Sequence, residues 1–412
     1  MTYLAEFRSH WKSLLGASIG LAVGAALNYF TLSTFGPPLI AALGWSKADF
    51  ALVGSLPLAT MLLMPVAGRF TDRFGTRIAV IVGFSVVPLS FLAMSMMSGG
   101  LYQFFALNIL LNSFGVLTTA FVFCRVIVER FDRARGLALA LAMSASPLVA
   151  AIAAPLLSRL IAHSGWRSGY VALALVSGIG GLFAILLIGR SQPATTPARR
   201  KPRLSRQEFL ALMRNPTFLL LIGGTFLISV PQVFVTSQLK LIALDMGITD
   251  TIATYLVSLY AIGVIIGRWL SGIALDRIRP HLVAASILAL PAAGYLVLVA
   301  HLTGATLLLP AVLVIGFAHG AEGDIGAFLL SRHLDVRNFS LLFSFVNMMV
   351  GAGTVAGSLV LNLTLRLTGG YSPFLLFCAI GTLTGATLFG LTGLVRTERE
   401  GDPAGHGVSA QT

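Results

Sequence analysis

Residues 68 to 77 read Gly68-Arg69-Phe70-Thr71-Asp72-Arg73-Phe74-Gly75-Thr76-Arg77. This charged stretch separates two long apolar segments, which include Leu52 to Pro65 and Ile78 to Met97. Charges at this density between segments of membrane length predict a tight turn at a membrane surface. Gly68 would allow a helix to approach closely, and Gly75 would allow a turn with positive φ. A partial copy, Gly272-Ile273-Ala274-Leu275-Asp276-Arg277, lies 204 residues later (272 − 68 = 204).

The composition indicates a membrane protein. The 412 residues are 56% apolar and 10% charged, and the mean hydropathy is +0.89. Apolar stretches of about 20 residues recur along the chain, which is the length that a helix needs to cross about 30 Å of hydrocarbon. The strands of a membrane β-barrel would alternate polar and apolar residues, and these stretches do not. We therefore predict an all-α protein with many membrane-spanning helices.

The charged residues and the cysteines exclude several classes of function. A net charge of +13 would suggest nucleic acid as a partner of a soluble protein, but in a membrane protein the basic residues are better explained as topology signals. Cys124 and Cys378 both lie inside apolar segments, which argues against a disulfide framework or a thiolate metal site. The sequence contains no nucleophile–base set and no phosphate loop. We therefore expect no enzyme activity, no cofactor and no nucleic-acid partner.

The apolar pattern predicts about twelve spans in two sets of six. Leu14 to Phe35 is too long for the apolar region of a signal peptide, so it is expected to be the first span. The predicted parts are a six-helix bundle in 1–189, a basic Pro-rich linker in 190–216, a second six-helix bundle in 217–395 and a tail in 396–412. The spans are expected near 13–35, 50–68, 78–98, 101–126, 136–161, 168–189, 217–240, 251–275, 282–301, 305–330, 339–365 and 373–395.

The distribution of basic residues predicts the orientation. With the N-terminus in the cytoplasm, the inner loops hold most of the arginines, whereas the outer loops and span ends hold only Lys47, Arg159, Arg167, Lys240 and Arg366. Cytoplasmic loops of membrane proteins carry such an excess of Lys and Arg. The bias predicts an even number of spans, both termini in the cytoplasm and a place in the cytoplasmic (inner) membrane.

A second internal match supports a duplication. The stretch Ser164-Gly165-Trp166-Arg167-Ser168-Gly169-Tyr170 matches Thr368-Gly369-Gly370-Tyr371-Ser372-Pro373-Phe374, again 204 residues apart (368 − 164 = 204). Two independent matches at one spacing predict two six-helix bundles of like fold. Parallel repeats of this kind are the architecture of transporters whose substrate site lies between the halves.

The stretch from Gly68 to Arg77 resembles the signature between spans two and three of the major facilitator superfamily, and the resemblance covers nearly the whole chain. It implies a major facilitator fold of two pseudo-symmetric six-helix bundles. Within that superfamily the sequence is similar to bacterial relatives of the monocarboxylate transporters and oxalate–formate antiporters. This likeness is carried by Gly44-Trp45-Ser46, by Arg130-Phe131-Asp132-Arg133-Ala134-Arg135-Gly136-Leu137-Ala138, by Gly165-Trp166-Arg167 with Tyr170, and by Ser331-Arg332-His333-Leu334.

Arg268 lies within the eighth predicted span, eight residues before Asp276. At a rise of 1.5 Å per residue it sits roughly 12 Å from the inner surface, which is too deep for easy snorkelling. A guanidinium binds a carboxylate through two parallel hydrogen bonds. The resemblance implies the same role, because the monocarboxylate-type family carries a substrate-binding arginine in span eight. The alternative is a structural ion pair with an acid of span ten.

Glu322 and Asp324 are those acids, in the stretch His319-Gly320-Ala321-Glu322-Gly323-Asp324. Positions two apart on a helix differ by about 200°, so only one carboxylate can point straight into a central cavity. A buried carboxylate is a natural proton carrier, because burial disfavours its charged form, and its charge would control its attraction for Arg268. His319 shares a face with Glu322 and joins the predicted proton-coupling set. Helix-packing hydrogen bonds are the alternative for all three.

Other polar side chains in the spans either line the cavity or join helices. The substrate-binding candidates besides Arg268 are Asn28, Tyr29, Asn112, Gln238 and Tyr260, and Asn108 and Gln232 belong to the same group. Arg125 lies closer to the inner surface, where it can snorkel or pair with Glu129 one turn later. Two roles are considered for Arg125. One is a role in the inner gate or in helix packing, and the other is a role in an anion site.

Asp72 has a physical role at the inner end of span two. A carboxylate there can accept hydrogen bonds from the N-terminal NH groups of a neighbouring helix. The resemblance implies that this helix is span eleven of the other half and that the contact holds the inner gate closed. Topology anchoring by charge is the alternative. The predicted gating set is Asp72, Arg73, Arg77, Gly68, Gly75, Asp276, Arg277, Arg125 and Glu129.

Departures from the family pattern bear on the substrate. Many monocarboxylate transporters place an acid one turn before the span-eight arginine, where this chain has Val264, and carry a lysine in span one, which has none here after Lys12. The span-eleven lysine of oxalate-type antiporters is also absent from 339–365. These differences argue against lactate-like or oxalate-like specificity, and they relocate any proton coupling to span ten.

The sequence predicts a secondary active transporter that moves a small organic anion, in first place a monocarboxylate, by proton-coupled alternating access. The expected partners are that anion, protons and the lipid bilayer, and the chain is expected to act as a monomer. A proton-driven efflux antiporter for amphipathic compounds is one alternative, although span five lacks the glycine-and-proline signature of drug antiporters. A transporter-like sensor is the other, and it would need an appended domain larger than 396–412.

Overall fold

The computed structural model describes residues 3–131, 134–189, 213–302, 304–333 and 339–394, and these residues form helices joined by short turns. In this part of the chain, eleven helical segments are long and apolar enough to cross a membrane. One of them, Arg135–Ile188, has 54 residues, and its helix is broken at Gly165. Because that length exceeds one crossing, this segment crosses twice, and the described chain makes the twelve passes that the apolar pattern predicts.

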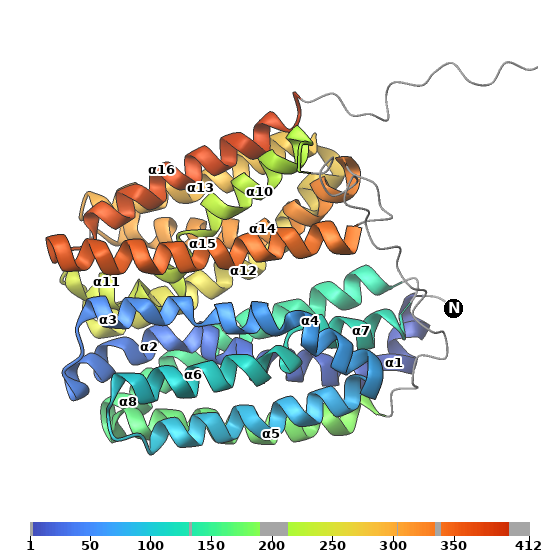
Figure 1. Ribbon diagram of the computed structural model, residues 1–412, viewed down its shortest axis with the longest axis horizontal. Coiled ribbons are helices and arrows are strands. Elements are labelled where there is room, and N and C mark those ends of the chain that lie inside the picture. Colours follow the sequence, from blue (N-terminus) through green and yellow to red (C-terminus); the bar gives the residue numbers. More distant parts are fainter. Residues whose placement is uncertain (1–2, 132–133, 190–212, 303, 334–338, 395–412) are drawn as a thin grey trace, which may run out of the picture.

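The helices form two groups that follow the two halves of the sequence, one above the other in Figure 1. The first, lower group comprises α1 (Tyr3–Val23), α2 (Ala25–Leu43), α3 (Lys47–Ala51), α4 (Pro57–Phe74), α5 (Thr76–Ser95), α6 (Leu101–Gly115), α7 (Ala120–Val128) and α8 (Arg135–Ile188). The second comprises α10 (Pro216–Ser229), α11 (Leu239–Asp245), α12 (Asp250–Arg277), α13 (Pro280–Val299), α14 (Ala305–His333), α15 (Phe339–Thr368) and α16 (Ser372–Leu391). Most of the predicted linker and all of the predicted tail lie outside the described residues.

The sequence repeat has a counterpart in the backbone. Gly165 has a φ of +79° and Gly369 a φ of +72°, and the two are 204 residues apart (369 − 165 = 204). Glycine is the residue that adopts positive φ without steric cost. Gly75, after α4, has a φ of +85° as predicted, whereas the second copy has Arg279 in that place, with a φ of −57°. The turn at Gly165 is thus repeated in both halves, and the turn at Gly75 is not.

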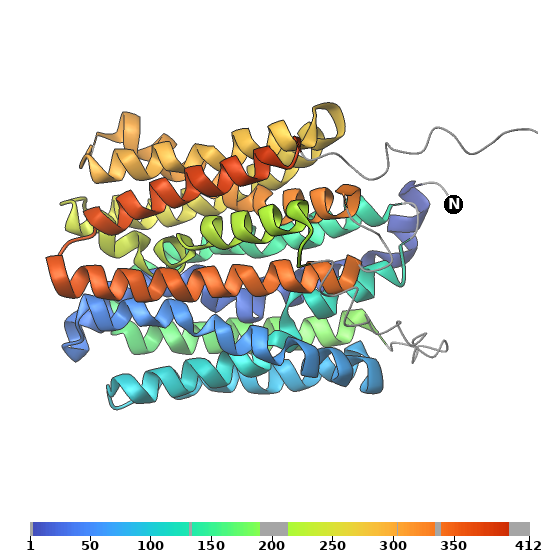
Figure 2. The same ribbon diagram turned by 45° about the horizontal axis from the view of Figure 1, so that its top comes forward.

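The two ends of the bundle differ. We call the end with the N-terminus and the last residues of α4 and α12 the near end, and the end with the turns at Gly165 and Gly369 the far end (Figures 1 and 2). One apolar cluster includes buried residues of both halves, such as Phe104 and Phe234. Two further clusters, which reach the near end, each stay within a single half. Among the described residues, the apolar core that joins the halves therefore lies toward the far end, and each apolar cluster that reaches the near end belongs to one half.

Candidate functional site

Backbone contact between α12 and α14 fixes the geometry of the site. Gly263 and Gly267 on α12 and Gly316 and Gly320 on α14 each lie against backbone atoms of the other helix. A β-carbon at Gly267 would overlap the carbonyl oxygen of Phe317. Small residues at a spacing of four allow membrane helices to approach this closely. Both Gly-xxx-Gly pairs are visible in the sequence, and they are the signal from which this contact could have been predicted.

Arg268 directly follows one of these glycines and reaches Asp324 of α14, with 3.5 Å between Nε and Oδ2. The side chain of Arg268 is 22% exposed and that of Asp324 is 48% exposed. The two form an ion pair, but Nε of Arg268 is buried without a hydrogen bond among the described residues. The next residue, Trp269, donates from Nε1 to Oγ of Ser144 in α8 of the first half at 3.1 Å, so this part of α12 lies against the other half. The ion pair considered from the sequence is present, and Arg268 still has donor capacity for an anion.

Glu322 lies in different surroundings, although it is only two residues before Asp324. Its side chain is 8% exposed. It accepts hydrogen bonds from Oγ of Ser229 at 2.8 Å and from Nε2 of Gln232 at 3.4 Å. Oε1 of Gln232 accepts in turn from the hydroxyl of Tyr29 at 2.6 Å. This chain of hydrogen bonds connects Glu322 in the second half to α2 in the first half.

His319 lies one turn before Glu322, with 3.9 Å between Nε2 and Oε2. Its side chain is 9% exposed, and neither ring nitrogen has a hydrogen-bond partner among the described residues. Buried Tyr260 of α12 contacts the imidazole edge-on, with 5.9 Å between ring centroids. The structure therefore gathers Tyr29, Tyr260, His319 and Glu322 in one buried cluster, separate from the more exposed pair of Arg268 and Asp324.

The remaining polar candidates join helices. Nδ2 of Asn28 in α2 donates to Oδ1 of Asn108 in α6 at 3.3 Å, and Oδ1 of Asn112 in α6 accepts from Oγ1 of Thr60 in α4 at 3.3 Å, all within the first half. Gln238 lies in a π-helical segment and accepts from the hydroxyl of Tyr371 at 3.2 Å. Burial raises the pKa of that hydroxyl, which lies between two spans and stays protonated as a donor. These contacts match the helix-packing alternative.

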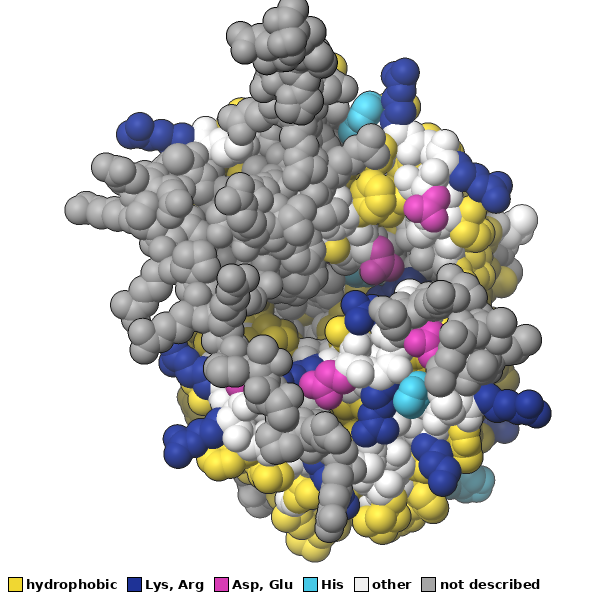
Figure 3. All heavy atoms as spheres, turned by 90° about the vertical axis from the view of Figure 1, so that its right-hand side faces the viewer, with side chains coloured by type: hydrophobic (Ala, Val, Ile, Leu, Met, Phe, Trp, Pro, Cys, Tyr) yellow, Lys and Arg dark blue, Asp and Glu magenta, His cyan; other side chains and the backbone are white. Residues whose placement is uncertain are grey.

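Asp72 lies at the near end and pairs within its own half. Arg125 of α7 donates from Nη1 to Asp72 and from Nε to Glu129 at 2.9 Å. The side chain of Asp72 is 63% exposed. Figure 3, which looks onto the near end, shows acidic and basic side chains where the two halves meet and a hollow between them. The expected contact with span eleven would involve the start of that span, and residues 334–338 just before α15 lie outside the described residues.

The other charged gating candidates form no ion pair with any described residue. Arg73 lies over the ring of Phe74, 5.4 Å from its centroid, and Nε of Arg77 is buried without a hydrogen bond to the described part of the chain. Asp276 and Arg277 are exposed at the end of α12. Gly68 lies beneath a ring of α7, where a β-carbon would meet Phe121 at 3.2 Å. Within the described part of the chain, the predicted gating residues thus form no ion pair between the two halves.

A buried lysine joins the halves at the far end. Lys240 of α11 is 3% exposed, and its Nζ lies 2.8 Å from Oδ1 of Asp250. The same ammonium donates to Oγ of Ser158 in α8 of the first half at 2.9 Å. Thr254 donates to that oxygen at 3.0 Å. From the sequence Lys240 was assigned only to the outer end of a span, because its partners come from elements that meet only when the halves pack.

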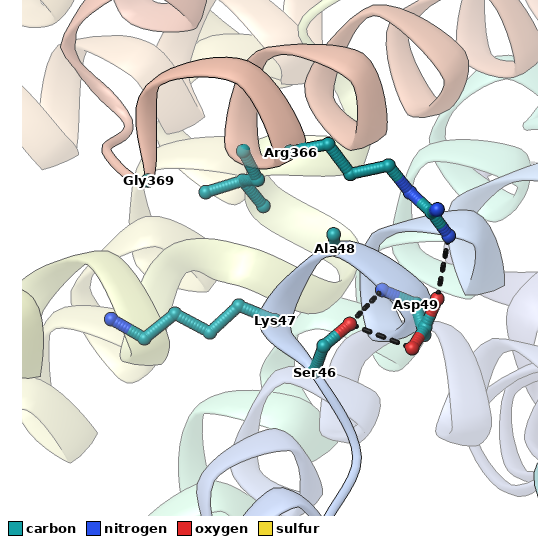
Figure 4. Close-up of a pocket in the computed structure, with 7 residues that line it drawn as sticks. Ser46, Lys47, Ala48, Asp49, Arg366 and Gly369 are labelled. Carbon is teal, nitrogen blue, oxygen red and sulfur yellow. Dashed lines mark hydrogen bonds and ion pairs between the residues drawn. The ribbon is translucent and has the colours of Figure 1, made fainter.

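Two further ion pairs close the far end. Figure 4 shows Arg366 of α15 donating to Asp49 of α3, at 2.9 Å. Lys47, at the start of α3, pairs with Asp245 of α11. Asp49, Lys47 and Arg366 border a surface pocket of about 410 Å³. The far end is therefore held by charged contacts between α3 of the first half and α11 and α15 of the second half.

Known proteins share this fold. The family model described as Major Facilitator Superfamily matches residues 19–335 and 239–409. The solved structure of the nucleoside transporter NupG has a TM-score of 0.75 at 13% identity, covering 92% of this chain and 99% of that chain. A D-xylose–proton symporter has a TM-score of 0.70 at 14% identity, covering 94% and 97%. At these identities the likeness shows the fold alone, and it confirms the predicted arrangement of two helical bundles.

The sequence relatives include monocarboxylate transporters and an efflux protein. Monocarboxylate transporter 4 of Rattus norvegicus is 26% identical over 371 residues, which cover 84% of this chain and 75% of that protein. Monocarboxylate transporter 13 of Bos taurus is 25% identical over 385 residues, covering 88% and 85%. The agnestins efflux protein AgnL12 of Paecilomyces divaricatus is 28% identical over 240 residues, covering 57% of this chain and about half, 52%, of that protein. The predicted likeness to the monocarboxylate group is confirmed, and efflux proteins are also similar.

Proposed function

We propose that this chain, which belongs to the major facilitator superfamily, moves a small organic anion, in first place a monocarboxylate, by proton-coupled alternating access. Its family makes it a multi-pass membrane transporter and not an enzyme. The substrate class, the coupling ion and the orientation are the proposed parts. Each of them is supported by a different feature of the interface between the halves.

The observation that carries the substrate class is Arg268 between the two halves. Its guanidinium is held by Asp324 at 3.5 Å and has an Nε–H without a hydrogen bond among the described residues. A carboxylate is the anion that a guanidinium fork binds bidentately, and it would displace Asp324. The names of the monocarboxylate relatives support the same class. We also assign substrate contacts to Tyr29 and Tyr260, which lie in the central cluster.

We place the coupled proton at Glu322, with His319 beside it and Asp324 as the acid that competes with substrate. Glu322 is buried, and among the described residues His319 is the only basic group within ion-pair distance of it. A carboxyl in such surroundings can exchange a proton without losing a fixed counter-ion. Its bond to Gln232 continues to Tyr29 in the other half. Protonation of Glu322 would therefore act on a contact between the two halves.

We assign the near end to the cytoplasm, because its loops carry the excess of arginine. We further propose that the ion pairs of Lys240 and Arg366 close the outer side, that this conformation is inward-facing, and that the protein acts as a monomer in the cytoplasmic membrane. Asp72, which is exposed in this state, and Arg125, which is partly exposed, would make their gating contacts when the inner side closes. The proposed units are 1–189, the linker 190–216, 217–395 and the tail 396–412.

Transport by purified protein in proteoliposomes tests the substrate class. A thermal-shift screen of carboxylates at two pH values identifies an anion that binds, and its binding and uptake are then compared in wild type, Arg268→Lys and Arg159→Lys. Lysine keeps the charge but loses the fork, and a hydrogen bond to a charged group contributes about 1.5–3 kcal/mol. Arg268→Lys should therefore weaken binding by about tenfold or more. Arg159 is exposed on α8, and its variant should behave as wild type.

Two outcomes reject parts of this proposal. Unchanged binding and uptake in Arg268→Lys would show that Arg268 does not bind the carboxylate. Stabilisation by no carboxylate at either pH would reject the organic-anion class.

A proton-driven efflux antiporter is the second candidate, and the similarity to the efflux protein AgnL12 favours it. In that case an amphipathic compound would occupy the interface without converging on Arg268. Export from inverted vesicles that depends on a proton gradient and survives Arg268→Lys would support this function over anion transport.

A further inference from the structure

A small cavity lies behind Glu322, on the side of α14 that faces α10, α13 and α16 of the same half. Its volume is about 10 Å³. Its polar wall consists of Glu322, His319, Thr382 and Tyr295, and the rest is apolar. The cavity is therefore separate from the pair of Arg268 and Asp324, which faces the other half.

Unpaired polar atoms gather in this wall. In the described part of the chain, nine buried side-chain atoms lack a hydrogen-bond partner, and three of them are Nδ1 and Nε2 of His319 and Oγ1 of Thr382. The side chain of His319 is 9% exposed and Thr382 is 1% exposed. Buried polar groups are nearly always hydrogen-bonded, because leaving one unpaired is costly. Three such atoms around one cavity point to a polar ligand that both donates and accepts.

The size and chemistry of the cavity fit one water molecule. A buried water needs roughly 10–15 Å³ and two to four polar partners, and this cavity offers about 10 Å³ and the side chains of His319, Thr382 and Glu322. A metal ion fits poorly, since no group of three or more His, Cys, Asp or Glu side chains among the described residues could hold one. The cavity therefore fits a water molecule better than a metal ion held by His, Cys, Asp or Glu side chains, and it has no room for a larger molecule.

We propose that this cavity binds one water molecule, which hydrogen-bonds to His319, Thr382 and Glu322 and passes the coupled proton between the carboxyl and the imidazole. The proposal rests on the proton coupling proposed above. It assigns the coupled proton to Glu322 and His319 together and not to Glu322 alone. A proton that reaches Glu322 forms an O–H bond there. On release, the water oxygen accepts this proton and gives one of its own to the unprotonated nitrogen of His319. The water is regenerated, and an ion pair of Glu322 and His319 is left.

No permanent counter-ion opposes this transfer. Among the described residues, His319 is the only base within ion-pair distance of Glu322, and Arg268 is paired with Asp324. Four other titratable groups face Glu322 or its neighbours from α2, α12, α13 and α16. They are the phenols of Tyr29, Tyr260 and Tyr295 and the thiol of Cys378. Phenols and thiols of this kind are neutral near pH 7. The proton can therefore move between Glu322 and His319 in response to pH.

Infrared difference spectra between acidic and neutral pH test the site on the substrate-free, full-length protein in lipid. Glu322→Gln removes the carboxyl band of Glu322 and so assigns it. Thr382→Val keeps the side-chain shape but removes one partner of the water, and His319→Gln removes the base. Both should shift the frequency and the pH midpoint of the Glu322 band. Thr382→Ser keeps the hydroxyl and should retain the wild-type band.

Water enriched in oxygen-18 adds a direct readout of the ligand. An O–H band that shifts with the isotope should be present in wild type and Thr382→Ser and lost in Thr382→Val. Melting temperatures establish that each variant is folded. If Thr382→Val does not fold, the band of Glu322 in His319→Gln tests whether the water site exists.

Three results would overturn the proposal. The first is a Glu322 band that does not titrate at all, and the second is a band that is identical in wild type, Thr382→Val and His319→Gln. The third result is a band that disappears on addition of sodium but not choline. The last would identify a sodium site. None of these spectra needs a substrate. If Arg268 fails to bind a carboxylate, the Glu322 band is still expected to behave as described. A failure of the water site is therefore distinguishable from a failure of the proposed anion site.

Discussion

Glu322 and Asp324 lie two residues apart on α14, yet their surroundings differ. Glu322 is 8% exposed and accepts hydrogen bonds from the neutral side chains of Ser229 and Gln232. Asp324 is 48% exposed and faces Arg268 at 3.5 Å. Positions two apart on a helix differ by about 200° in direction, and the glycine contact with α12 holds α14 in one rotation. One helix thus separates a carboxyl suited to hold a proton from a carboxyl suited to compete with an anion.

The comparison shows that depth in a span does not assign the role of a charged residue. Both acids lie at nearly the same depth, and both are expensive to place in a membrane. What distinguishes them is the partner that each meets across a helix contact. The predictions below act on that difference.

The largest effect is expected from Glu322→Gln, which keeps the shape of the side chain but cannot release a proton. A gradient of one pH unit is worth about 1.4 kcal/mol per proton, a tenfold concentration ratio. Wild type with one coupled proton should therefore accumulate the anion by up to about tenfold in proteoliposomes, and the variant should only equilibrate it. Exchange of labelled for unlabelled anion needs no net proton movement and should persist in the variant.

Asp324→Asn is the matched control for this experiment and should still accumulate the anion. Equal accumulation by wild type and Glu322→Gln would remove Glu322 from the coupling. Loss of accumulation in Asp324→Asn alone would exchange the roles of the two acids.

The next effect is expected from the contact that keeps the acids apart. In Gly267→Ala the new β-carbon would overlap the carbonyl oxygen of Phe317, so α12 and α14 must separate. Overpacking of this kind costs about 1–3 kcal/mol. The melting temperature should fall, and anion binding and its pH dependence should change together, because both acids move relative to Arg268.

Gly272→Ala tests the same substitution on the same helix without the contact, since nothing lies within 4 Å of a β-carbon there. The difference in melting temperature between the two variants isolates the cost of separating the helices. Equal melting temperatures would mean that the glycines do not fix the rotation of α14.

The fold follows from the sequence because its signals are local and strong. Apolar segments of membrane length define the passes, and the spacing of 204 residues identifies the duplication that reappears in the turns at Gly165 and Gly369. The charged candidates for the proposed site are also visible in the sequence, because a charge inside a span stands out. These candidates are Arg268, Glu322 and Asp324.

The partners of these residues were not predictable in the same way. Ser229 and Gln232 lie about 90 residues from Glu322 in the sequence, and an uncharged polar residue in a span looks the same whichever helix it faces. Thr382 has no feature in the sequence that distinguishes it from the other threonines in the spans. The contact between Lys240 and Ser158 spans 82 residues and depends on how the halves pack, which is a property of one conformational state.

The smallest effect is expected from Asp324→Asn and concerns the affinity for the anion. The ion pair with Arg268 is partly exposed, at 22% and 48%, and pairs of this kind contribute up to about 1 kcal/mol. Removing the competing charge should strengthen anion binding by up to about fivefold. Tighter binding should also slow release and lower the maximal uptake rate. Kd and uptake at low and high salt measure both effects.

Asp324→Glu keeps the charge and should bind the anion as wild type does. The gain in Asp324→Asn should shrink as the salt concentration rises, because screening already weakens the ion pair in wild type. If Asp324→Asn instead binds the anion more weakly, Asp324 orients the guanidinium of Arg268 and does not compete for it. Glu322 would then position the imidazole of His319, and Asp324 would position the guanidinium of Arg268. The anion would have to bind beside the ion pair of Arg268 and Asp324 instead of replacing it.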